Sequence, residues 1–187
     1  SIVFQVASFL RPGTGIVVSP LTALMEDQVG NLRRCGVSTA GLVTGSDSRS
    51  DRERFRDQLA AGAYAFIYIS PERLQIDKFR RELRAAVVSR PVSVISIDEA
   101  HCVSEWGHDF RPAYLNIARN ARELTTRRGH RPPLLALTGT ASQTVLRDIQ
   151  RELDIEDAEA LITPKSFDRK ELSFSIYKCR SDEKPHY

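Results

Sequence analysis

Cysteine is scarce in this sequence, which has three in 187 residues, at Cys35, Cys102 and Cys179. An odd number of widely separated cysteines does not form the disulfide framework of a small secreted domain. His101, Cys102 and His108 lie close together in the sequence, but no fourth ligand follows at a spacing usual for zinc. We therefore expect reduced thiols in a cytosolic protein, and no metal site at these three residues.

Long apolar runs are also missing. No stretch approaches the roughly 18 consecutive apolar residues that indicate a membrane-spanning helix. The first residues lack a positively charged region followed by an apolar segment and a cleavage site. We expect neither membrane insertion nor secretion, and the sequence has no internal repeat or low-complexity tract.

Charge of one sign is not in large excess, since 27 Lys and Arg stand against 24 Asp and Glu, for a net charge of +3. The total charge is therefore only a weak indication of a nucleic-acid partner. Arginine is locally concentrated, and such groups are commonly solvated helix ends rather than binding sites. The concentrations are Arg33–Arg34, Arg80–Arg81, Arg127–Arg128 and Arg131.

Short apolar segments alternate with amphipathic ones along most of the chain. Strands are expected at 15–19, 38–43, 65–69, 92–97 and 133–138, and helices at 22–35, 51–61, 77–88, 112–127 and 142–153. This alternation predicts an α/β fold with a parallel sheet and right-handed crossovers. The length suits one such domain with a substantial core.

Two adjacent carboxylates, Asp98 and Glu99, follow the strand expected at 92–97. In an open parallel α/β sheet, ligands bind at the carboxyl ends of the strands. One carboxylate can hold Mg²⁺ through its waters while the other orients an attacking water, which suits hydrolysis of a nucleoside triphosphate. The alternative for a bare pair of this kind is capping of a following helix.

Stacking and cationic side chains are dense just after this acid pair. Trp106, His108, Phe110 and Arg111 lie within six residues, without a helical or strand period, which favours a loop. Aromatic rings and arginine are suited to binding single-stranded nucleic acid. The alternative makes Trp106 and Phe110 ordinary core aromatics.

The segment from Asp98 to Tyr114 resembles motif II and the aromatic-rich loop of RecQ-family DNA helicases. These belong to superfamily 2, whose motor consists of two RecA-like domains. Residues 17–29 resemble motif Ia, residues 68–74 motif Ib and residues 136–141 motif III, although Gly139 stands where the family more often has alanine. The resemblance covers nearly the whole chain. It implies a RecA-like (P-loop NTPase) fold with helices on both faces of the sheet, and ATP and Mg²⁺ as cofactors.

The resemblance also implies roles at the nucleotide site. Ser1 matches the hydroxyl that ends the family's phosphate-binding loop, and would ligate Mg²⁺; its alternative is an ordinary helix N-cap. Asp98 would hold the Mg²⁺ through water, and Glu99 would position or deprotonate the attacking water. His101 would couple the nucleotide site to the opposite domain.

Thr138 and Thr140 would link the acid pair to closure of the two domains through hydroxyl hydrogen bonds, or else cap the helix expected from Ser142. Ser19 and Thr22 would offer hydroxyl and main-chain donors to a DNA phosphate. Four further residues are expected to bind DNA, by stacking or through donors and charge: Trp106, His108, Phe110 and Arg111.

We expect residues 1–163 to form the first RecA-like domain, beginning within its own phosphate-binding loop, and residues 164–187 to form the hinge toward a second one. Lys170-Glu171 stands where the family usually has Pro-Asn, and an edge strand of the first domain is the alternative for this segment. The second RecA-like domain and DNA are the expected partners. The expected location is the bacterial cytoplasm, at the nucleoid, or a eukaryotic nucleus.

The predicted function is that of an ATP-dependent DNA helicase motor, with 3′-to-5′ polarity implied by the resemblance, and with the isolated fragment inactive. The resemblance also points to DNA repair and recombination. Two alternatives stand beside it. One is a non-catalytic nucleic-acid-binding module derived from a helicase. The other is a superfamily 2 RNA helicase, which is not expected to carry the sequence at residues 106–112.

Overall fold

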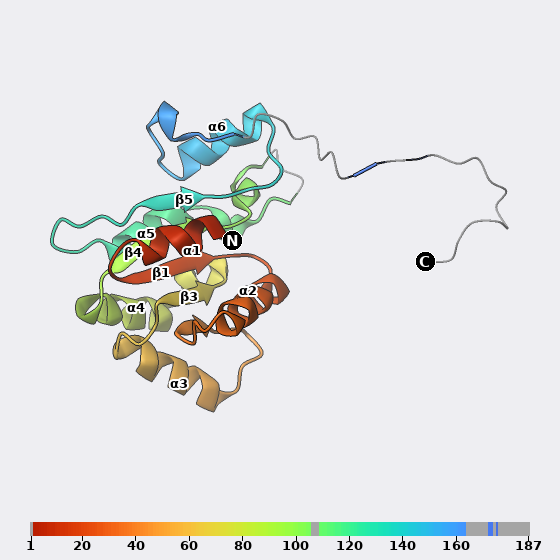
Figure 1. The fold of residues 1–187 in the computed structure, drawn as a ribbon. Helices are drawn as coiled ribbons and strands as arrows, with labels where there is room; N and C mark the ends of the chain where they lie inside the picture. The colour runs from red at the N-terminus through yellow and green to blue at the C-terminus, as the bar shows by residue number, and fades with distance from the viewer. Residues whose placement is uncertain (1, 106–108, 164–171, 174, 176–187) are drawn as a thin grey trace. The chain divides into compact units, whose positions relative to one another are not determined.

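Five parallel strands form the central sheet, in the order β2-β3-β1-β4-β5 (Figure 1). Their bounds are β1 (Thr14–Val18), β2 (Ala40–Leu42), β3 (Phe66–Ile69), β4 (Val92–Ile97) and β5 (Leu134–Ala136). All five predicted strands are present, and the predicted parallel sheet is confirmed. Because every pairing is parallel, the carboxyl ends of all five strands meet at one edge of the sheet.

The structure is a computed structural model that describes residues 2–105, 109–163, 172, 173 and 175. It divides into two units, Ser1–Glu156 and Asp157–Tyr187. The first unit contains the whole sheet. In the second, the described residues include one short 3₁₀ helix, η4 (Ala158–Ala160). The first unit ends before the domain boundary expected at 163/164, and most of the predicted hinge at 164–187 lies outside the described residues.

Helices pack on both faces of the sheet. Their bounds are α1 (Ile2–Phe9), α2 (Thr22–Arg34), α3 (Arg49–Ala60), α4 (Asp77–Ser89), α5 (Ile117–Thr125) and α6 (Gln143–Glu152). Helices α1 and α2 share one buried cluster with the sheet, and the other four contribute to a second, larger cluster. The expected arrangement of helices on both faces is thus confirmed.

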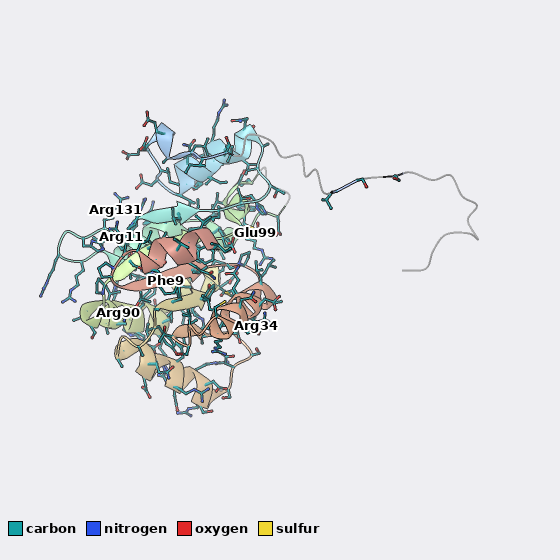
Figure 2. The ribbon with its side chains drawn as sticks, viewed as in Figure 1. Phe9, Arg11, Arg34, Arg90, Glu99 and Arg131 are labelled. Carbon is teal, nitrogen blue, oxygen red and sulfur yellow. The ribbon has the colours of Figure 1, made fainter. Side chains whose placement is uncertain are left out.

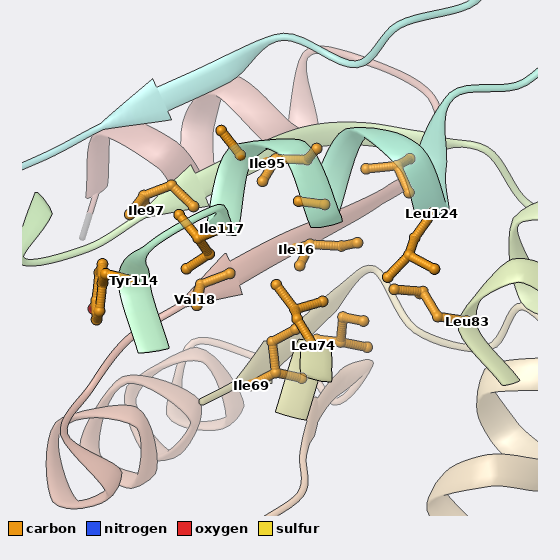
Figure 3. Close-up of a cluster of buried hydrophobic side chains, with 14 of the residues drawn as sticks. Ile16, Val18, Ile69, Leu74, Leu83, Ile95, Ile97, Tyr114, Ile117 and Leu124 are labelled. Carbon is orange, nitrogen blue, oxygen red and sulfur yellow. The ribbon is translucent and has the colours of Figure 1, made fainter. Parts of the chain in front are cut away.

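The strands supply both clusters because successive side chains of a strand point to opposite faces. In β1, Ile16 and Val18 belong to the larger cluster and Val17 to the smaller one. Figure 3 shows Ile16 and Val18 beside Ile95 and Ile97 of β4 in the larger cluster. Burial on both faces explains why these strands are continuous apolar runs in the sequence.

The helix predicted from Pro112 to about residue 127 is wrong at its beginning. Pro112 opens a short 3₁₀ helix, η3 (Pro112–Tyr114), and the chain then turns at Asn116, which has a left-handed φ of 61°. Asparagine tolerates this backbone better than most residues. Helix α5 therefore begins only at Ile117.

None of the helices in the described part of the chain combines the length and the apolar character needed to cross a membrane.

Candidate nucleotide and nucleic-acid site

The acid pair lies at the carboxyl edge of the sheet, where β4 ends. The Asp98 amide still donates to the Val18 carbonyl, at 2.8 Å, so Asp98 is held in line with β1. Glu99 then turns the chain in the left-handed region, with φ 49° and ψ 46°. It is the N-cap of the buried 3₁₀ helix η2 (Ala100–Val103) but makes no side-chain capping bond. The Glu99 carboxylate therefore does not cap η2.

His101 lies between the acid pair and the end of the neighbouring strand. Its Nδ1 is 2.9 Å from the Thr138 hydroxyl and 3.3 Å from a Glu99 carboxylate oxygen. The imidazole is buried, while the Glu99 side chain is partly exposed. The structure thus brings together three of the residues expected at the nucleotide site, from η2 and from the segment after β5.

The two threonines after β5 do not cap α6. The Thr138 hydroxyl donates to the Thr140 carbonyl at 3.1 Å, and the Thr140 amide lies 3.3 Å from the same hydroxyl. Helix α6 is instead capped by Ser142, whose hydroxyl accepts from the Val145 amide. The capping alternative for Thr138 and Thr140 is therefore wrong.

No role was predicted for Tyr114 from the sequence, although this residue fixes the backbone of the acid pair. Its hydroxyl donates to the Asp98 carbonyl at 2.9 Å, and its ring is fully buried. Burial, and then the neighbouring Cys102 and Asp98, raise the pKa of this phenol, so it remains a donor. Only its place sixteen residues after Asp98, at the end of the resembling segment, could have drawn attention to it.

The aromatic-rich segment, residues 105–111, is anchored at both ends. Before it, the buried Ser104 hydroxyl donates to an Asp148 carboxylate oxygen on α6 at 2.6 Å. At its end, the Arg111 amide donates to the Cys102 carbonyl at 3.0 Å. The Arg111 guanidinium donates to the Pro20 carbonyl at 3.3 Å, which places it beside the turn after β1. Two segments predicted to bind DNA therefore lie next to each other.

The other residues predicted to bind DNA differ in their exposure to solvent. Thr22 is exposed as the first residue of α2, and Phe110 is half-buried. The Ser19 side chain is fully buried and its hydroxyl has no partner among the described residues, and its contact with a DNA phosphate stays a prediction. The position of Ser19 at the very end of the buried strand explains its burial. Ser1, Trp106 and His108 lie outside the described residues.

A group of possible metal ligands forms around His101, Cys102 and Asp109, whose ligand atoms lie within 4.8 Å of one another. In a tetrahedral zinc site, bond lengths of about 2.0–2.3 Å put ligands roughly 3.5 Å apart. Burial, and then the Asp109 carboxylate, raise the pKa of the Cys102 thiol to about 11, whereas zinc requires a thiolate. The Cys102 thiol is therefore protonated when no metal ion is bound.

A second link to this edge of the sheet comes from α1. The Gln5 side-chain amide donates to the Tyr68 hydroxyl on β3 at 3.2 Å. Burial raises the pKa of Tyr68, and the charge on Asp98 raises it further, so the phenol stays protonated near the acid pair. The sequence pattern did not single out either residue for this contact.

Comparisons with known proteins show the family to which this chain belongs. The profile described as "DEAD/DEAH box helicase" matches residues 1–149. The chain is 39% identical to the "ATP-dependent DNA helicase RecQ" of Bacillus subtilis (strain 168) over 184 residues, which is 98% of this chain and 29% of that protein. It is 38% identical to the "ATP-dependent helicase wrn-1" of Caenorhabditis elegans, over 96% of this chain and 16% of that protein. The chain thus spans less than a third of these relatives.

Solved structures show the same fold at low identity. The Pyrococcus furiosus Hef helicase domain superposes with a TM-score of 0.54 and 20% identity, over 83% of this chain and 30% of that one. The C-terminal domain of the DEAD-box protein Dbp5 gives 0.51 and 17%, over 82% and 79%. The RecA-like fold is therefore confirmed. Curated relatives named as RecQ DNA helicases also disfavour the RNA helicase alternative. The chain belongs to the DEAD/DEAH box helicase family and is a helicase domain homologous to the RecQ DNA helicases.

Proposed function

We propose that this chain is the first RecA-like motor domain of an ATP-dependent DNA helicase, which couples ATP hydrolysis to movement along single-stranded DNA and to duplex unwinding. The observation that carries the proposal is the position of His101. It contacts both a Glu99 carboxylate oxygen and the Thr138 hydroxyl. A carboxylate placed in this way at the carboxyl edge of a parallel sheet fits a group that handles the attacking water.

The residues at this edge fit ATP with Mg²⁺. Mg²⁺ prefers oxygen ligands and keeps several of its waters, and the Asp98 carboxylate and the Thr138 and Thr140 hydroxyls are oxygen donors. ATP supplies the phosphoryl group and Mg²⁺ neutralises its charge. Asp98 would hold the ion through water, and Ser1 would add a hydroxyl ligand.

Glu99 would act on the attacking water. As the water oxygen bonds to the γ-phosphorus and the bond to the leaving oxygen breaks, a proton of the water passes to the Glu99 carboxylate. His101 would hold that carboxylate in place through the contact at 3.3 Å, and Thr138 would hold His101. Motion of the segment after β5 would then reach Glu99 through His101, which suits coupling to a second RecA-like domain.

DNA would reach the acid pair through the aromatic-rich segment. Trp106 and Phe110 would stack on bases, and His108, Arg111 and Thr22 would contact the backbone. Because the Arg111 amide is bonded to Cys102 within η2, a displacement of this segment is passed to the residues that follow Glu99. In a cell such a protein would act where DNA is, in the bacterial cytoplasm or the eukaryotic nucleus.

The test is Glu99→Gln in the full-length protein. We expect nucleotide binding to persist while DNA-stimulated hydrolysis falls by roughly two to four orders of magnitude, as loss of an acid–base group does. Glu156→Gln is the matched control, since Glu156 is an exposed carboxylate in the same unit. Phosphate release and binding of a fluorescent ATP analogue are the measurements. Normal turnover in Glu99→Gln would show that the acid pair has been misassigned.

A further inference from the structure

A hollow with a volume of about 690 Å³ lies at the amino-terminal edge of the sheet. Its residues come from the segments that immediately precede three strands: Arg11 and Pro12 before β1, Pro91 before β4, and His130 before β5. In a parallel sheet this edge is opposite to the acid pair. Figure 2 shows Arg11 at one end of the sheet and Glu99 at the other.

The hollow is basic. Arg11, Arg127, Arg128 and His130 line it, and no aspartate or glutamate is among its described lining residues. The Arg127 guanidinium donates to the carbonyls of Val87 and Val88 at the end of α4. Carbonyl acceptors orient a guanidinium without neutralising it, so its positive charge remains available to an anionic ligand.

The hollow is also apolar in part. Val87 lies beneath it, and Val88 is 59% exposed although it is a large aliphatic side chain. Ser93 is among the lining residues but is only 1% exposed, so its hydroxyl lies beneath the surface of the hollow.

We propose that this hollow binds an acidic peptide segment of a partner protein, with carboxylates on the arginines and an apolar side chain over Val88 and Pro91. Guanidinium groups pair with carboxylates in a bidentate geometry. The described lining residues include no phenylalanine, tyrosine or tryptophan ring for stacking bases, which favours a peptide over nucleic acid. The inference does not depend on the proposed helicase activity.

The test measures binding of a short fluorescein-labelled peptide that alternates aspartate with leucine to the full-length protein, by fluorescence anisotropy. The double variant Arg11→Glu with Arg128→Glu should raise the Kd at least about tenfold, because both side chains are exposed and the reversals replace attraction by repulsion. Arg81→Glu makes the same kind of change on the exposed side of α4, outside the hollow, and should leave the Kd within about twofold.

A second peptide, with serine in place of leucine, separates the contribution of the apolar residues from that of the arginines. It should bind more weakly than the leucine peptide, since it cannot cover Val88. Failure of the leucine peptide to bind the wild-type protein overturns the proposal. So does an equal loss of binding in Arg81→Glu, which would indicate attraction by charge alone. If the double variant instead lowers binding of a DNA oligonucleotide more than binding of the peptide, the hollow is a nucleic-acid surface and the proposal fails.

Discussion

Glu99 adopts a left-handed backbone that costs a non-glycine residue about 1–3 kcal/mol, and its neighbours hold it there. On one side the Asp98 amide is bonded to β1, and on the other the Ala100 amide donates to the Leu137 carbonyl at 2.9 Å. Tyr114 completes the restraint through the Asp98 carbonyl. The neighbouring residues thus hold Glu99 in a strained backbone conformation, as its proposed catalytic role requires if the carboxylate must stay at one fixed position.

Tyr114→Phe tests this restraint at the scale of one hydroxyl. The change removes the donor to the Asp98 carbonyl and leaves that carbonyl without this partner, which should lower the free energy of unfolding by about 1–3 kcal/mol. We expect the kcat of the full-length ATPase to fall several-fold while the KM for ATP changes little, because Glu99 is displaced but the nucleotide contacts remain. Steady-state kinetics and thermal melting are the measurements.

Tyr64→Phe is the matched control for Tyr114→Phe. The Tyr64 hydroxyl donates to the Gln58 side chain at 2.6 Å, between α3 and the start of β3, away from the acid pair. Tyr64→Phe removes the same phenolic oxygen and should leave kcat unchanged. If both variants lowered kcat in proportion to their loss of stability, Tyr114 would have only a structural role.

At the scale of elements, the aromatic-rich segment joins η2 to the turn after β1. The Arg111 side chain reaches the Pro20 carbonyl, and its amide returns to Cys102. Arg111 is therefore held by one side-chain and one backbone hydrogen bond, to two neighbouring parts of the chain. A ligand that moves it must also move η2, which carries His101.

Arg111→Ala in the full-length protein should reduce stimulation of the ATPase by single-stranded DNA, because the segment loses both a cation and its contact with the turn after β1. If Arg111 neutralises a phosphate, the dependence of DNA affinity on salt should also become shallower by about one counterion. Trp106→Ala should cost about 1–3 kcal/mol of DNA binding through the loss of one stacked base. Titrations of DNA binding and ATPase stimulation at several salt concentrations measure both effects.

Thermal melting separates the two interpretations of Trp106. A core tryptophan would lose about 3–5 kcal/mol of stability on truncation to alanine. A large fall in melting temperature with DNA stimulation retained would therefore show that the segment is structural. Arg84→Ala is a suitable control for Arg111→Ala, since Arg84 of α4 is a half-exposed arginine paired with Glu123 of α5.

At the scale of the whole molecule, the described residues proposed for the nucleotide site lie at the carboxyl edge of one parallel sheet. Phosphoryl transfer relies on electrostatic groups that surround the nucleotide, including the lysine of a phosphate-binding loop. Residues 1–187 contain no Gly-Lys-Ser or Gly-Lys-Thr sequence. The chain also spans less than a third of its RecQ relative.

We therefore expect the polypeptide of residues 1–187 to hydrolyse ATP no faster than its own Glu99→Gln variant, with or without single-stranded DNA. Phosphate release from the two polypeptides, purified in parallel, is the measurement. The full-length protein provides the positive control. Clear stimulation by DNA above the level of the variant would mean that these residues form a complete hydrolytic site.

The sequence by itself determined the order of strands and helices, the parallel sheet and the family. Each of these follows from local periodicity or from short contiguous motifs such as residues 98–101. The bounds of elements did not follow from the sequence in the same way, as at Asn116, where one left-handed residue delays the start of α5. That conformation depends on packing of the segments around it, which periodicity does not report.

Only the tertiary structure decided which side chains meet. The contacts of His101 with Thr138, of Tyr114 with Asp98 and of Arg111 with Pro20 join residues 16 to 91 positions apart. The burial of Ser19 and the basic hollow before the strands are likewise products of the sheet. The physical reason is that hydrogen bonds and burial depend on distance in space, and strand order brings remote segments to the same edge.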